Sequence, residues 1–302
     1  MTDGVNVALN ELIELKRHAQ RVNYPPERKA MRAGNHLSRL RGRGMDFAEV
    51  RNYQAGDEIR HMEWRVTART GRPHVKLYQE ERERPVILLA DFNPSMFFGT
   101  RFAFKSVVAA RLAAIIAWTA IKQGDKIGGL LFSANEHSEF IPRSRENAVL
   151  PLLASLSHYT NNRINNSGKS NPLSEILIRL RRVIRPGSII VIISDFYNMD
   201  TDSEQHLSRL RAHNDVLAYY VCDPLELAPP KPQYYAMTNG EQELLLDTTS
   251  DEITSAYQNY CTQRVKMLQA LFKSLQVQCV QVTAESDLPS VVRQTFPRRS
   301  RV

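Results

Sequence analysis

The stretch PVILLADFNPSM, residues 85–96, is an uninterrupted apolar run that ends on an acid. An apolar run of this length without polar alternation is typical of a strand that is covered on both faces, as in a parallel sheet. Asp91 comes at its end, and Asn93 and Ser95 follow at two-residue spacing. Taken alone, these three residues are ordinary helix-cap and turn formers. A second acid at the same sheet edge would instead make them half of a metal-ion site.

Strand and helix patterns alternate from residue 85 onward. A long helical stretch at 101–124 is followed by KIGGLLFS at 126–133, and GSIIVIISD at 187–195 is another buried strand that ends on an acid. A last strand is expected at 277–284. Alternation of this kind predicts an α/β domain over 85–302, with a Rossmann-like, mostly parallel sheet flanked by helices.

The first 84 residues have a different character. An amphipathic helix is expected at the start, and after it the sequence becomes polar and arginine-rich, with glycines that mark turns. The segment RPHVKLYQ, residues 72–79, alternates as an extended edge strand does. Residues 1–84 are therefore predicted to form an N-terminal helix and a small, mostly β subdomain.

Composition narrows the function classes. Three cysteines without a close pair, among 302 residues, disfavour a zinc site or a disulfide framework and fit a reducing compartment. The sequence shows neither a signal-peptide pattern nor an apolar run long enough to span a membrane, so a cytoplasmic protein is expected. The net charge of +8 favours a nucleic acid, an anionic lipid or an acidic protein as partner. The arginine clusters lack interleaved aromatic residues, which argues against nucleic-acid binding.

The two strand-ending acids are expected to meet. In an open doubly wound sheet, ligands bind beyond the carboxyl ends of the strands where the strand order reverses, and the first and fourth strands flank that point. These are the strands that end in Asp91 and Asp195. The loop at 165–173 brings Ser170, or less readily Ser167, to the same rim. Together with Asn93 and Ser95, the two aspartates and the loop serine would offer carboxylate, amide and hydroxyl oxygens. These are hard ligands, which suit Mg²⁺ or Mn²⁺.

Several motifs in this order resemble one bacterial family. They are GRGMDFAEVRNYQAGDEIRHMEWRVTARTGRPHVKLYQEERERPVILLADFNPSM at 42–96, FKSVVAARLAA at 104–114, QGDKIGGLLFS at 123–133 and IISDF at 192–196. The chain is similar to the "domain of unknown function fifty-eight" (DUF58) family, over about residues 38–222. The resemblance implies a von Willebrand factor A-like domain with a loop like the metal-ion-dependent adhesion site.

In that site the resemblance assigns Asp91, Asn93 and Ser95 to the Asp-x-Ser-x-Ser loop, Ser170 to the later Thr position and Asp195 to the distal Asp. Asn93 departs from the pattern: its carbonyl can still coordinate, but the longer side chain changes the geometry. The resemblance also implies a role as an adaptor, working with a MoxR-type AAA+ ATPase in the assembly or maturation of other proteins. An acidic client would suit the basic chain.

A second signature, GDEIRHMEW at 56–64, has two interpretations. In the structural one, Asp57 pairs with Arg60 or Arg69 and Trp64 packs in a core, since Arg–carboxylate forks commonly hold irregular segments. In the functional one, Asp57, Arg60, Trp64 and Arg69 form a docking surface for a partner.

Two other functions remain as alternatives. A magnesium-dependent phosphohydrolase would use Asp91 as nucleophile, and such chemistry usually needs a second acid two positions later. Position 93 is Asn, which cannot act as a general acid. The second alternative function is nucleic-acid binding through the arginine clusters. The sequence therefore favours a non-catalytic interaction module over an enzyme.

Overall fold

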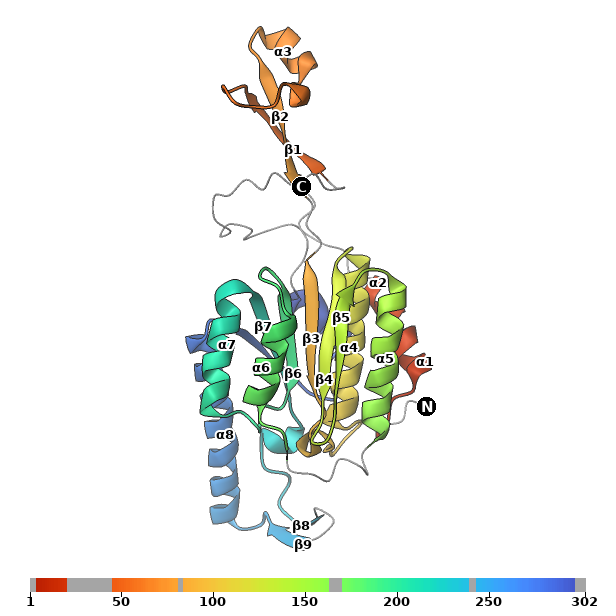
Figure 1. The fold of residues 1–302 in the computed structure, drawn as a ribbon. Helices are drawn as coiled ribbons and strands as arrows, with labels where there is room; N and C mark the ends of the chain where they lie inside the picture. The colour runs from red at the N-terminus through yellow and green to blue at the C-terminus, as the bar shows by residue number, and fades with distance from the viewer. Residues whose placement is uncertain (1–3, 21–44, 81–83, 163–169, 239–242, 297–302) are drawn as a thin grey trace. The chain divides into compact units, whose positions relative to one another are not determined.

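The computed structural model describes residues 4–20, 45–80, 84–162, 170–238 and 243–296 (Figure 1). These residues form two compact units. The larger consists of the described residues up to 20 together with those from 84 onward, and the smaller consists of residues 45–80.

The larger unit is built on a six-stranded sheet with the order β10-β7-β6-β3-β4-β5. Its strands are β3 (Pro85–Asp91), β4 (Lys126–Phe132), β5 (His137–Arg143), β6 (Ile189–Ser194), β7 (Asp215–Val221) and β10 (Gln278–Val282). Only β5 runs antiparallel to its neighbour in this sheet. The predicted mostly parallel α/β fold is confirmed, and the order places β3 directly beside β6.

Both faces of this sheet are covered by helices. Val86, Leu88 and Ala90 of β3 join one core, and Ile87 and Leu89 join the other, as alternation along a strand requires. The first core also takes residues from α1 (Leu9–Glu14), α2 (Lys16–Gln20), α4 (Lys105–Lys122), α5 (Glu146–Asn161) and α9 (Leu288–Thr295). The second takes residues from α6 (Leu173–Val183), α7 (Thr201–His213) and α8 (Asp251–Ser274).

The N-terminal helices belong to the larger unit. The indole nitrogen of Trp118 in α4 donates to the carbonyl oxygen of Leu12 at 3.0 Å, and Arg111 pairs with Glu11 at 2.6 Å. The division at residue 84 had grouped this helical segment with the β-rich part. It packs on α4 instead, because its apolar stripe needs a helix face to cover it.

The described part of the smaller unit is built on a two-stranded sheet. Strand β1 (Met45–Asn52) pairs antiparallel with β2 (His74–Glu80), and a register shift between Phe47 and Glu49 interrupts the ladder. Between the strands lie the 3-10 turn η1 (Ile59–His61) and the short helix α3 (Trp64–Thr70). Gly71 ends α3 at φ 68°, a left-handed conformation that glycine adopts without strain.

A hairpin precedes α8 in the larger unit. Strands β8 (Tyr234–Thr238) and β9 (Glu243–Asp247) pair antiparallel. The turn expected around Asn239 and Gly240 lies outside the described residues. Two further 3-10 turns, η2 (Pro94–Met96) and η3 (Pro224–Glu226), follow β3 and β7. Within the described ranges, none of the helices combines the length and the apolar character needed to cross a bilayer.

Candidate functional site

Asp91 lies at the carboxyl end of β3 and is 2% exposed. Its Oδ1 accepts a hydrogen bond from the backbone N–H of Asn93 at 2.8 Å, and its Oδ2 accepts one from the hydroxyl of Ser194 at 2.7 Å. Ser194 is the last residue of β6, so this bond joins the two strand ends. The carboxylate thus lies where the strand order reverses, as predicted.

Asp195 follows β6 and is also fully buried. Its Oδ1 accepts from the backbone N–H of Tyr197 at 3.1 Å, and its Oδ2 is 2.9 Å from the Lys105 ammonium. Burial, followed by the negative charge of Asp195, raises the pKa of Asp91 to about 7. The two carboxyl groups come at the ends of β3 and β6, which are neighbours in the sheet.

Asn93 is buried and binds the backbone of the loop before α6. Its Oδ1 accepts from the N–H of Asn171 at 3.2 Å, and its Nδ2 donates to the carbonyl oxygen of Asn171 at 3.4 Å. Ser170, which precedes Asn171 in the sequence, is partly buried. Ser167, the other candidate from this loop, lies outside the described residues. The Asn93 amide thus holds the loop.

Ser95 has a buried hydroxyl oxygen with no hydrogen-bond partner among the described residues. A buried hydroxyl without a partner is costly, so such groups ordinarily have a ligand, an ion or a water. Ser95 sits on η2, within the loop that begins at Asp91. Its oxygen is consequently the best indication of a bound group at this edge.

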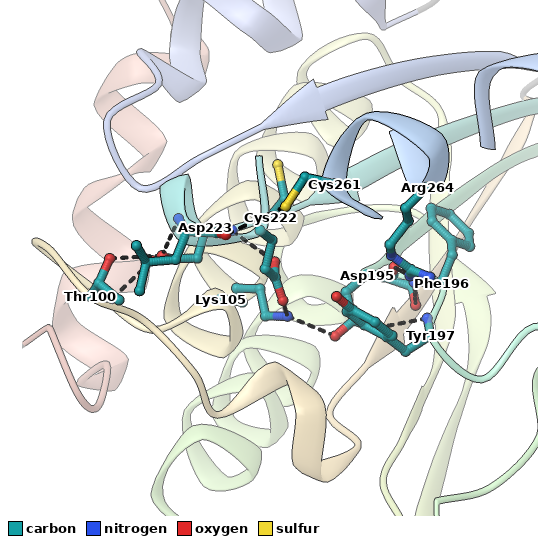
Figure 2. A network of polar contacts seen from close by, with 12 residues as sticks. Thr100, Lys105, Asp195, Phe196, Tyr197, Cys222, Asp223, Cys261 and Arg264 are labelled. Atoms are coloured by element: carbon teal, nitrogen blue, oxygen red, sulfur yellow. Dashed lines mark hydrogen bonds and ion pairs between the residues drawn. The ribbon is translucent and has the colours of Figure 1, made fainter. Parts of the chain in front are cut away.

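Lys105, which sequence reasoning missed, is the cation of this site. It is 2% exposed and pairs with Asp195 at 2.9 Å and with Glu226 at 2.6 Å (Figure 2). Burial alone would lower the pKa of Lys105, but the charges of Asp195 and Glu226 outweigh it, so the pKa is raised. A signal was present: a lysine in the first turn of an apolar helix opposes the helix dipole, which indicates a specific anionic partner.

Glu226 connects this lysine to the turn after β7. Burial raises the pKa of Glu226, although Lys105 opposes that effect. Its other oxygen accepts from the N–H of Asp223 at 2.9 Å. Asp223 in turn accepts from the backbone N–H and the hydroxyl of Thr100, at 2.8 and 2.7 Å (Figure 2). The loop after η2 and the η3 turn are thereby held against each other.

Arg264 of α8 covers the other side of Asp195. Its guanidinium lies 3.5 Å from the centre of the Tyr197 ring and donates to the backbone oxygen of Asp195 at 2.9 Å (Figure 2). Phe196 between them has φ 55°, a conformation that costs energy for a bulky residue, and its ring packs edge-on against Phe272. The packing of α8 therefore fixes the direction of the Asp195 loop.

The carboxyl groups of this cluster outnumber its cations, so the cluster carries excess negative charge once Asp91 is ionised. Asp91, Asp195 and Glu226 bring carboxyl groups, against the ammonium of Lys105 and the more peripheral guanidinium of Arg264. Oxygen donors with excess negative charge suit a hard divalent cation. Asp91 and Ser95 fit that role best, whereas Asn93 is engaged by Asn171 and Asp195 by Lys105. In the described ranges there is no cluster of three or more His, Cys, Asp or Glu residues with the arrangement of a metal site.

The second predicted surface lies on the smaller unit, and two of its expected contacts are wrong. Asp57 pairs with Arg51 at 2.7 Å, not with Arg60 or Arg69, and accepts from the N–H of Gln54 at 2.9 Å. This backbone contact, together with Arg51, lowers the pKa of Asp57 against the opposing effect of burial.

Trp64 is 65% exposed and does not pack in a core. Over residues 45–80 the unit has a two-stranded sheet and one seven-residue helix, and in this described part no second layer covers the indole. Arg60 and Arg69 are exposed as well. Asp57 is thus engaged in an ion pair within the unit. Trp64, Arg60 and Arg69 are exposed and belong to residue types that are frequent in protein interfaces.

The chain is similar in sequence to mycobacterial proteins. The chain is 29% identical over 222 residues to the uncharacterized protein Rv1480 of Mycobacterium tuberculosis, covering 72% of this chain and 68% of that protein. The uncharacterized protein Mb1516 of Mycobacterium bovis matches to the same extent.

Similar solved structures include the conserved hypothetical protein BatB from Bacteroides thetaiotaomicron, with a TM-score of 0.44 and 14% identity over 70% of this chain and 96% of that one. The SpRpn10 VWA domain has a TM-score of 0.38 and 11% identity over 73% of this chain and 100% of its own.

The sequence profile of one family, described as "Protein of unknown function DUF58", matches residues 49–266. The matched segment includes β3, β6, Lys105 and Arg264, together with most of the smaller unit. Because the match covers well over half of the sequence, the chain belongs to the DUF58 family.

Proposed function

We propose that this chain is a non-catalytic protein-interaction module whose contact site is the carboxyl edge of β3 and β6. Asp91 and Ser95 would hold Mg²⁺ or Mn²⁺ there, and the cation would supply an open position for a carboxylate of the partner. The observation that carries the proposal is the buried Ser95 hydroxyl without a described partner, beside carboxylates that outnumber their cations. Ser170 and Asp195 would border the ion, and Asn93 would hold the loop.

The geometry favours binding over hydrolysis. Hydrolysis with Asp91 as nucleophile would usually need a general acid two positions later in the chain. The residue two positions later is Asn93, whose amide is engaged by the Asn171 backbone. An amide there cannot protonate a leaving group, so the phosphohydrolase alternative loses its general acid.

The net charge of the chain and its family resemblance are the basis for proposing a partner. A net charge of +8 favours an acidic protein, and the exposed Trp64, with Arg60 and Arg69, offers a second contact in the smaller unit. The family resemblance points to a MoxR-type AAA+ ATPase, with the chain as its adaptor for an acidic client in the cytoplasm.

Calorimetric titration of Mg²⁺ and Mn²⁺ into the purified chain tests the site. We expect saturable binding in the wild type, a strong loss in Asp91→Asn, and a smaller loss in Ser95→Ala. The exposed Asp202 of α7 provides a matched control, because Asp202→Asn removes the same charge away from the site. Equal heats for the wild type and Asp91→Asn would contradict the metal proposal.

Partner binding needs a separate measurement. The MoxR-type ATPase of the same organism should bind the immobilised chain in Mg²⁺, more weakly in EDTA, and more weakly when Asp91 is replaced. If neither EDTA nor Asp91→Asn weakens binding, the edge of β3 and β6 is not the contact. If the chain does not bind under any condition, this ATPase is not the partner.

A further inference from the structure

Helix α8 uses one face to pack on its own unit. Cys261, Leu268 and Phe272 are buried, and the hydroxyl of Tyr257 donates to the backbone oxygen of Leu225 at 2.6 Å. These residues recur at intervals of four and seven residues, as one face of a helix does. Figure 1 shows α8 at the outer side of the larger unit, next to β8 and β9.

A different stripe of α8 is apolar and exposed. Ile253, Tyr260 and Met267 are 38%, 60% and 60% exposed and stand seven residues apart. Ala256, Gln263 and Ala270 are also exposed and lie three residues after each of them. This is the a and d spacing of a coiled-coil seam over three repeats, and the alanines allow a second helix to approach closely. Exposed apolar stripes of this regularity mark interaction sites.

The charges beside the stripe are divided between its ends. Asp251 and Glu252 lie in the first turn of α8, whereas Lys266 and Lys273 lie in its C-terminal half, and all four are exposed. A parallel copy of the helix would bring like charges together. An antiparallel copy would bring the acidic end of each helix to the basic end of the other, so the stripe is complementary to itself.

We propose that a second copy of this chain covers the stripe, with the two α8 helices paired antiparallel about a two-fold axis. In an antiparallel seam, a positions face d positions of the other helix. Tyr260 of each copy then faces Gln263 of the other, and Ile253 faces Ala270. Glu252 lies beside Lys273 across the interface. A seam of six positions per helix is small against a standard interface, so the dimer forms in a concentration-dependent manner.

Cysteine cross-linking distinguishes the orientations in the full chain. Gln263→Cys places thiols near the two-fold axis, within reach of a short bismaleimide linker. Ile253→Cys places them about 25 Å apart along an antiparallel pair, because the residues that meet are 17 positions apart and a helix rises about 1.5 Å per residue. We expect cross-linked dimer from Gln263→Cys and none from Ile253→Cys. The wild type gives the background of its own cysteines, of which Cys222 and Cys261 are buried.

Sedimentation equilibrium at micromolar concentrations measures the association. Tyr260→Glu with Met267→Glu should leave a monomer, and the control pair Ser255→Glu with Gln269→Glu, exposed and away from the stripe, should dimerise as the wild type does. Glu252→Lys should weaken dimerisation by about threefold to tenfold, and adding Lys273→Glu should restore it, because the double variant swaps both members of each pair.

A wild-type chain that stays monomeric throughout would overturn the proposal. So would equal cross-linking of the Ile253→Cys and Gln263→Cys chains, which fits a parallel pair. A dimer that survives the two stripe substitutions would place the interface elsewhere.

Discussion

The Asp91 carboxyl makes folding depend on pH in the metal-free chain. Its folded pKa of about 7 lies well above the unfolded value of about 3.9. The stability that it contributes is therefore complete below about pH 4 and is lost as the pH rises to about 7. In EDTA, we expect the free energy of unfolding of the wild type to fall by about 2–4 kcal/mol between pH 4.5 and 7 relative to Asp91→Asn. Urea denaturation at a series of pH values measures both curves.

The asparagine variant is the right comparison because it keeps the shape and removes the charge. The Asp202→Asn chain should follow the wild type throughout, since Asp202 is exposed. Parallel curves for the wild type and Asp91→Asn would mean that Asp91 ionises as an ordinary surface acid does.

Lys105 should be essential for the stability of the site. Lys105→Met leaves Asp195 and Glu226 buried without their cation, a change that typically costs about 3–5 kcal/mol. Adding Glu226→Gln should recover part of this loss, because one uncompensated charge is removed. Chemical denaturation of the single and double variants gives the coupling, and Lys231→Met, at an exposed position, serves as the control. Strictly additive losses would show that Lys105 and Glu226 act separately.

These residues also show how far sequence reasoning reached. Asp91 and Asp195 could be placed together because a topology rule connects strand ends that are distant in sequence. Lys105 and Arg264 lie on helices, and nothing local indicates which carboxylate a helical cation will meet. Asn93 was predicted to be a metal ligand. Its hydrogen bonds to the backbone of Asn171 could not be predicted, because they depend on a loop conformation that the sequence does not specify.

At the scale of elements, the N-terminal helices should stabilise the larger unit. Leu12 is fully buried against the core that includes α4. Leu12→Ala should lower the free energy of unfolding by about 2–4 kcal/mol through lost burial and the cavity left behind. Asn10→Ala, on the exposed side of the same helix, should change it by less than about 0.5 kcal/mol. Equal, small effects of both in denaturant titrations would show that this segment does not contribute to the core.

The elements that were predicted well are those whose own residues determine them. Strands β3 and β6 are apolar runs long enough to need cover on both faces, and their adjacency follows from the doubly wound order. The packing of α1 on α4 could not be predicted from the sequence. An amphipathic stripe indicates that a helix packs against an apolar face, but it does not indicate which element supplies that face. Helix α9 lies beyond the last strand that was expected, and its eight residues give too short a pattern to recognise.

At the scale of the whole molecule, the chain presents chemically different surfaces. The edge of β3 and β6 in the larger unit carries two buried acids, whereas the exposed surface of the smaller unit combines Trp64 with arginines. An acidic partner could use both, through a cation at the first and direct contacts at the second. Because the residues lie in separate compact units, each contact can be removed without repacking the other.

A double-mutant cycle on the proposed MoxR-type ATPase complex tests this division. Asp91→Asn should weaken binding only when Mg²⁺ is present, and Trp64→Ala should weaken it by about 2 kcal/mol or more with or without Mg²⁺, since an exposed tryptophan is a frequent hot spot. For independent contacts the two losses add to within about 0.5 kcal/mol in biolayer interferometry. A Trp64→Ala loss that disappears in EDTA would show that the two surfaces act as one site. A Trp64→Ala chain that binds as the wild type does would confine the contact to the edge of β3 and β6.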